Sequence, residues 1–127
     1  AAAIDFNGRS VLDVGCGQGD FAKHLVRLNV TPALLRGIDG MPEFVAEAKR
    51  KALPWEEYEV GDVFEPGTLG SACDWIVMSG VLCNLDPSQT QQLLTNCWRI
   101  TRYGVAFNFP TTRGLSKTPV PIAPFER

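Results

Sequence analysis

The sequence contains very few of the side chains that build metal centres or histidine-dependent catalytic sites. It has a single histidine, His24, and its four cysteines are spread along the chain without a C-x-x-C pair. Structural zinc sites use closely spaced ligand pairs, so this pattern predicts no metal site. Because the chain has enough apolar residues to build a core without cross-links, we expect reduced thiols rather than disulfides.

The chain also lacks a strong excess of charge and any long apolar segment. Twelve lysines and arginines stand against fourteen aspartates and glutamates, for a formal net charge of -2. A domain that binds nucleic acid through its phosphates carries a basic excess, so we expect no nucleic-acid partner. No apolar run approaches the roughly 18 residues that cross a bilayer, and no basic segment leads into a hydrophobic one at the start. We therefore expect no membrane association and a cytoplasmic location.

The apolar content is sufficient for one folded domain. The chain has 127 residues, of which 45% are hydrophobic and 20% are charged, and domains most often run to roughly 100–150 residues. After residue 109 the sequence becomes rich in proline, which excludes a central strand or a long helix. We divide the chain into a core at residues 1–109 and a proline-rich C-terminal tail at residues 110–127.

Short apolar stretches alternate with segments that carry helix signals. Strands are predicted at Val11–Val14, Leu34–Asp39, Tyr58–Gly61, Trp75–Ser79 and Val105–Phe109. Apolar residues recur at helical spacing over residues 21–28, with Asp20 as the expected N-cap. Pro42 suits the first turn of a second helix, and Asp86 with Gln89 forms a capping box before a third.

The alternation of strand and helix, four times along the core, predicts an α/β fold. We expect a Rossmann-like, doubly wound parallel sheet of about five strands, covered by helices on both faces. In such sheets the ligand binds beyond the carboxyl ends of the strands, where the strand order reverses. The residues at those ends are Asp13–Gly19, Asp39, Asp62, Ser79–Asn84 and Asn108.

A glycine-rich segment follows the first predicted strand. Glycines stand at positions 15, 17 and 19, between that strand and the first helix. Missing side chains let the backbone approach a ligand, and the helix end presents unpaired N–H groups; a flexible turn is the alternative. A dinucleotide site prefers G-x-G-x-x-G beside a pyrophosphate. Here Asp13 precedes the loop, and its carboxylate would be unfavourable beside phosphates but suits a cationic ligand. With Asp39 as an acceptor for ribose hydroxyls, the pattern indicates a nucleoside that carries positive charge.

Four segments in this order resemble the class I S-adenosylmethionine-dependent methyltransferases. They are residues 11–20 (VLDVGCGQGD), 37–39 (GID), 61–63 (GDV) and 74–82 (DWIVMSGVL). They lie within residues 8–109, so the resemblance covers nearly the whole core. It implies S-adenosyl-L-methionine as the cofactor and methyl transfer as the reaction.

The resemblance also implies a role for individual positions. Asp13 would help to hold the methionine portion, Asp39 the ribose hydroxyls and Asp62 the adenine amino group, while Met41 and Val63 would pack on the adenine ring. The expected cofactor-binding residues are Asp13, Gly15, Cys16, Gly17, Asp39, Gly40, Met41, Asp62, Val63 and Ser79. The alternatives are a helix cap or a solvated loop acid for each aspartate, and a core side chain for Met41 and Val63.

No catalytic residue is predicted. Methyl transfer needs an in-line approach of the nucleophile, for which positioning matters most. Residues 79–85 are expected to form the floor of the transfer site, and Cys83 and Asn84 stand where many members of the resembled family carry two histidines. The signature of Asn or Asp, two prolines and an aromatic residue is absent there, which disfavours methylation of adenine or glutamine side chains. We expect a small-molecule acceptor, whose identity the sequence does not give.

Two other functions remain open. The chain is also consistent with a non-catalytic module of the same fold or a fragment of a larger methyltransferase, because the resembled family continues into two more strands. We describe it as a minimal or truncated methyltransferase core. The edge of its fifth strand is expected to be covered by the tail, by a second copy of the chain or by a partner chain. The second of these other functions is that of a nicotinamide dinucleotide oxidoreductase domain.

Overall fold

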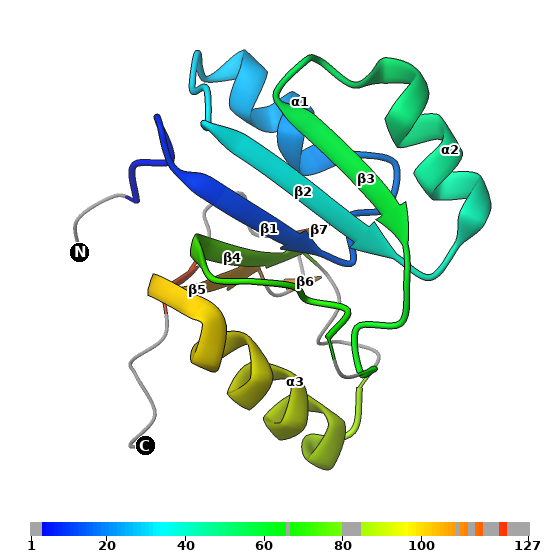
Figure 1. Cartoon of the computed structure of the whole chain (residues 1–127), viewed down its shortest axis with the longest axis vertical. Coiled ribbons are helices and arrows are strands. Elements are labelled where there is room, and N and C mark those ends of the chain that lie inside the picture. The colour runs from blue at the N-terminus through cyan, green and yellow to red at the C-terminus, as the bar shows by residue number, and fades with distance from the viewer. Residues whose placement is uncertain are drawn as a thin grey trace.

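The computed structural model describes residues 4–65, 67–79, 85–108, 110–111, 114–115 and 120–121. Strands and helices alternate through the first half of the chain (Figure 1). The elements are β1 Ser10–Val14, α1 Asp20–Arg27, β2 Leu34–Asp39, α2 Pro42–Lys51, β3 Glu56–Val60, β4 Cys73–Ser79, α3 Pro87–Ile100 and β5 Thr101–Asn108. Three two-residue strands follow, β6 Pro110–Thr111, β7 Gly114–Leu115 and β8 Val120–Pro121.

The main sheet has the strand order β3-β2-β1-β4-β5-β8. The pairs from β3 to β5 are all parallel, and β8 alone is antiparallel to its neighbour. The predicted α/β fold with five parallel strands is confirmed. The chain leaves β1 towards β2 on one side and returns to β4 on the other, so the strand order reverses between β1 and β4. The carboxyl ends of these two strands are where such a sheet binds its ligand.

The core has two layers because successive side chains of each strand point to opposite faces. Val11 belongs to the cluster that packs under α1 and α2, whereas Leu12 and Val14 belong to the cluster under α3. Figure 1 shows α1 and α2 on one side of the sheet and α3 on the other. The buried anchors of α3 are Leu93 and Cys97. Both faces of the central strands are therefore covered.

Three of the four cysteines are buried free thiols, namely Cys16, Cys73 and Cys97. Burial raises the pKa of Cys73 to about 11 and that of Cys97 to about 12. These side chains stay protonated and behave as small apolar groups. Cys83 lies outside the described residues.

Local helix signals in the sequence are confirmed at two helices and wrong at one. Pro42 begins α2, and Asp86 caps α3 through a reciprocal pair of hydrogen bonds with Gln89. The N-cap of α1 is Gly19 rather than the predicted Asp20, which is the first residue of the helix. Gly19 has a φ of 86°, a left-handed conformation that turns the chain out of the glycine-rich loop and that aspartate adopts less readily.

The connection between β3 and β4 contains turns. Its described residues form no helix. The guanidinium of Arg36 donates to the carbonyl oxygens of Thr68 and Leu69, at 3.1 and 2.6 Å. This side chain from β2 holds the turn against the sheet, in place of the backbone hydrogen bonds of a helix.

The tail contributes an edge strand. β8 pairs with β5 through Val120 opposite Phe107 and Pro121 opposite Ala106. The expectation that the tail covers the edge of the fifth strand is confirmed for this short stretch. No helix in the described ranges is long and apolar enough to cross a membrane.

Candidate functional site

The glycine-rich loop connects β1 to α1 in a conformation that depends on its glycines. Gly15, Gly17 and Gly19 have φ values of 74°, 55° and 86°, a region that other residues rarely adopt. The N–H groups of Gly15 and Cys16 donate to the carbonyl oxygen of Ile38, at 2.8 and 3.0 Å. The loop is therefore folded back against the carboxyl end of β2.

Asp39, the last residue of β2, joins this loop to the loop that follows β2. Its Oδ2 accepts a hydrogen bond from the N–H of Gly17 and its Oδ1 accepts one from the N–H of Met41, each at 2.9 Å. An ionised carboxylate offers about four lone-pair sites. The half-buried side chain therefore holds the loops in place and retains acceptor capacity for further donors.

A cavity opens at the carboxyl ends of β1, β2 and β3. It has a volume of about 420 Å³ and is lined by Gly15, Asp39, Gly40, Val60, Gly61, Asp62 and Val63. Its volume lies in the usual range for pockets that bind small molecules. The structure thus brings together five of the residues predicted to bind a cofactor, Gly15, Asp39, Gly40, Asp62 and Val63.

The residues expected around an adenine ring differ in how they face this cavity. Asp62 is exposed, and its Oδ1 accepts a hydrogen bond from the N–H of Phe64 at 2.9 Å. Val63 both lines the cavity and packs against the core. Met41 is 49% exposed and does not line the cavity.

Sequence reasoning missed Val60 as a residue of this site. It is 52% exposed and forms part of the cavity wall. The available signal was an apolar residue at the end of a strand that otherwise consists of three glutamates and a tyrosine.

Asp13 lies beneath the site rather than in its wall. It occupies the middle of the sheet, paired with Gly37 on one side and Val77 on the other, and is 1% exposed. Neither carboxylate oxygen accepts a hydrogen bond from the part of the chain that the structure describes. Burial, with smaller contributions from Asp39 and Asp20, raises the pKa of Asp13 to about 7. An unpaired acid beside two other acids favours a cationic ligand nearby.

Two further predicted residues, Cys16 and Ser79, lie in the glycine-rich loop and at the end of β4. Cys16 is buried, and burial together with Asp13 and Asp39 raises the pKa of its thiol to about 12, so it is not a nucleophile. Ser79 ends β4, with its backbone paired to Asn108. The segment 80–84, the predicted floor of a transfer site, lies outside the described residues. Among the residues described, no group of three or more His, Cys, Asp and Glu side chains is placed to hold a metal ion.

Comparison with known proteins agrees with this geometry. Residues 11–104 match the family described as methyltransferase domain. The comparison with curated protein sequences gave no match. Among solved structures, a TehB-like S-adenosylmethionine-dependent methyltransferase from Corynebacterium glutamicum is 26% identical, with a TM-score of 0.67 over 87% of this chain and 60% of that one.

Two other solved structures are similar in fold. Magnesium protoporphyrin IX methyltransferase from Synechocystis, with bound S-adenosylmethionine, is 22% identical, with a TM-score of 0.70 over 86% of this chain and 52% of that one. Phosphoethanolamine N-methyltransferase 1 from Haemonchus contortus, with phosphoethanolamine and S-adenosylhomocysteine, is 17% identical, with a TM-score of 0.73 over 86% of this chain and 24% of that one.

The chain spans 60% or less of the length of these three structures. The family match covers well over half of the chain and includes the glycine-rich loop, the acid at the end of β2 and the cavity between them. The resemblance found in the sequence is therefore confirmed, and the chain belongs to the methyltransferase-domain family, the S-adenosylmethionine-dependent class I methyltransferases.

Proposed function

We propose that this chain binds S-adenosyl-L-methionine in the cavity at the carboxyl ends of β1, β2 and β3 and transfers its methyl group to a small molecule. The observation that carries the proposal is the position of Asp39. Its carboxylate lies in the cavity wall and at the same time fixes the N–H of Gly17, at 2.9 Å. One side chain thus shapes the backbone cradle and presents acceptor oxygens to a sugar.

The residues present fit this cofactor. The glycine-rich loop offers backbone without side chains, since a Cβ added at Gly17 would meet no atom within 4 Å. Asp39 offers acceptors for two hydroxyls, and Val60 and Val63 offer apolar walls for a flat ring. The unpaired carboxyl of Asp13 lies below, next to Asp39. Together they suit a nucleoside with hydroxyls and a positive charge better than a pyrophosphate.

The described residues contribute binding and orientation to the transfer. When bound, S-adenosyl-L-methionine would supply a methyl group whose bond to the sulfonium sulfur breaks as a nucleophile bonds in line to the methyl carbon, with S-adenosylhomocysteine as the leaving group. Asp39 and the glycine-rich loop would hold the nucleoside and methionine portions. Orientation of this kind removes much of the barrier of a bimolecular step. No base is assigned to the transfer.

A small-molecule acceptor and a cytoplasmic location complete the proposal. The chain has a net charge of -2 and no basic excess, which disfavours a nucleic acid as the acceptor. Two of the similar structures are named as methyltransferases of magnesium protoporphyrin IX and of phosphoethanolamine. Both acceptors are small molecules.

Calorimetric titration of the folded chain with S-adenosylmethionine, S-adenosylhomocysteine and NAD tests the cofactor assignment. We expect both sulfur nucleosides to bind and NAD not to bind. A folded chain that binds neither sulfur nucleoside would contradict the proposal. Tight binding without turnover over a panel of acceptors would favour the non-catalytic module.

Asp39→Ala tests the site itself. We expect it to weaken binding of S-adenosylhomocysteine by about 1–3 kcal/mol, because charge-assisted hydrogen bonds to the ligand and the contact with Gly17 are lost together. Glu57→Gln is the matched control, since Glu57 is an exposed acid of β3 that does not line this cavity. Unchanged affinity of the Asp39 variant, or an equal loss in the control, would refute the assignment.

A further inference from the structure

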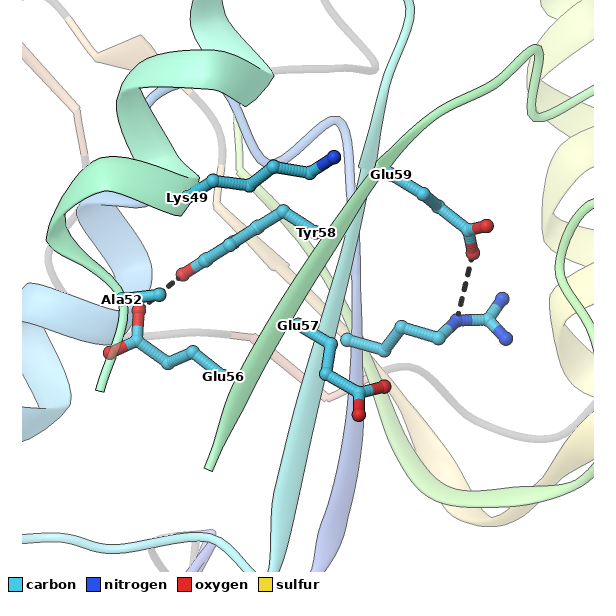
Figure 2. A pocket seen from close by; sticks show the side chains of 7 residues that line it. Lys49, Ala52, Glu56, Glu57, Tyr58 and Glu59 are labelled. Atoms are coloured by element: carbon cyan, nitrogen blue, oxygen red, sulfur yellow. Dashed lines mark hydrogen bonds and ion pairs between the residues drawn. The ribbon is translucent and has the colours of Figure 1, made fainter. Parts of the chain in front are cut away.

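Tyr58 of β3 is a buried aromatic residue that the sequence motifs do not single out. It is 7% exposed and belongs to the cluster under α1 and α2. Figure 2 shows Tyr58 and Glu56 reaching from β3 to the side of α2, whereas Glu57 and Glu59 extend to the other side of the strand. This alternation directs the tyrosine ring towards the first turn of α1.

The ring of Tyr58 packs directly on the backbone that supports the glycine-rich loop. A Cβ added at Gly37 would lie 2.7 Å from Cε1 of Tyr58 and 2.8 Å from Cβ of Cys16. Only glycine at position 37 leaves this space for the ring, because real Cβ atoms do not approach other atoms so closely. The ring therefore lies between β2 and the start of the loop.

The hydroxyl of Tyr58 reaches the other end of the same loop. A Cβ added at Gly19, the N-cap of α1, would lie 3.0 Å from Oη of Tyr58. The hydroxyl donates to Oε1 of Glu56 at 2.6 Å, and Oε2 of Glu56 accepts from the N–H of Leu53 at 2.8 Å. Burial and the Glu56 carboxylate raise the pKa of Tyr58, so the hydroxyl stays protonated and keeps donating.

These contacts give the loop a support from β3 in addition to those from β2. Ile38 and Asp39 of β2 hold Gly15, Cys16 and Gly17 by hydrogen bonds. The Tyr58 hydroxyl lies beside Gly19, where the loop enters α1, and leaves little space for a side chain there. Glu56 fixes the direction of that hydroxyl and is itself anchored on the segment after α2.

We infer that Tyr58 and Glu56 are positioning residues for the cofactor, acting through Gly19 and the first turn of α1. The inference rests on the proposed function, because it assigns the pair to the same cofactor site. Neither side chain lines the cavity beside Asp39, so their effect on a ligand passes through the loop. Loss of the Tyr58 hydroxyl should make the glycine-rich loop more mobile without leaving a cavity in the core, because the ring remains.

Tyr58→Phe tests the inference because it keeps the ring against Gly37 and removes only the hydroxyl. We expect S-adenosylhomocysteine to bind about 5- to 10-fold more weakly, the size of one lost hydrogen bond. In the cofactor-free chain, amide hydrogen exchange should speed up at residues 19–22 and stay unchanged in α3. Glu56→Gln, which keeps the shape but weakens the acceptor, should show a smaller change of the same kind.

Glu47→Gln is the matched control. It removes the hydrogen bonds and ion pair that Glu47 makes with Arg50 and Lys51 on α2 and should change the melting temperature without changing the affinity. A Tyr58→Phe chain with wild-type affinity and exchange would overturn the positioning role, as would an equal loss of affinity in the control. If the wild-type chain binds neither sulfur nucleoside, the proposed function fails, and the role of the pair in cofactor binding fails with it.

Discussion

At the scale of single residues, Asp13 is a buried acid whose ionisation lowers the stability of the fold. Its carboxyl is buried without a hydrogen-bond partner among the described residues, and its pKa is raised from 3.8 to about 7. Between these two values the folded chain keeps a proton that the unfolded chain releases. The free energy of unfolding is therefore expected to fall as the pH rises from about 4 to about 7.

Asp13→Asn should remove this pH dependence. At pH 8 we expect the variant to be more stable than the wild type, by up to about 4 kcal/mol, because the cost of a buried charge is gone. Urea unfolding at pH 5 and pH 8 measures the difference, with Glu57→Gln as the exposed-acid control. The same variant should bind S-adenosylhomocysteine more weakly. A variant that is less stable than the wild type at pH 8 would contradict this account.

The predictions from the sequence were least complete for the roles of single residues. Gly15 and Asp39 could be selected as candidates because they belong to a contiguous motif and a strand end, and the structure brings both to one cavity wall. Tyr58 and Val60 were missed because their roles depend on what β3 packs against, which spacing along the chain does not show. Met41, expected on an adenine ring, is exposed beside the cavity, and its role stays a prediction.

At the scale of elements, α3 owes its start to a side-chain cap. Oδ1 of Asp86 accepts from the N–H of Gln89 at 2.8 Å, and the Gln89 side chain accepts from the N–H of Asp86 at 3.1 Å. Asp86→Ala should lower the free energy of unfolding by about 1 kcal/mol, since it leaves N–H groups of the first turn without a partner. Denaturant unfolding measures this. Gln92→Ala, at an exposed position in the same helix, should cost much less, and equal losses would count against the cap.

The ends of an element were predicted correctly where its own residues determine them, and they were misplaced where pairing with a neighbouring strand determines them. The apolar run of β2 gave both of its ends correctly, at Leu34 and Asp39. β3 begins at Glu56, two residues before the predicted Tyr58. An edge strand tolerates charged side chains, so its first residues lack the apolar pattern on which the prediction was based. β5 begins at Thr101 rather than Val105. The Thr101 hydroxyl lies within hydrogen-bond distance of the carbonyl oxygens of Asp74 and Gly104, at 3.0 and 2.8 Å, and donates its one proton to either of them.

At the scale of the whole molecule, the sheet has one edge covered by the tail. The parallel strands end at β5, and the covering strand β8 contains Pro121, which has no N–H to offer to a further strand. Proline therefore suits the outermost position of a sheet. The sequence identified the tail as unsuited to a central strand, but it did not show which residues would pair with β5.

Removal of the tail should make the chain associate with itself. A chain that ends at residue 109 loses β8 and exposes the backbone N–H and C=O groups of β5 to other molecules, and such edges template pairing between chains. We expect a concentration-dependent rise in molar mass, measured by sedimentation. The matched control lacks only residues 122–127, which leaves the pairing of Val120 and Pro121 with β5 intact, and should behave like the whole chain. If the chain without β8 associates no more than the whole chain, or the control associates equally, β8 is not what keeps this edge from pairing.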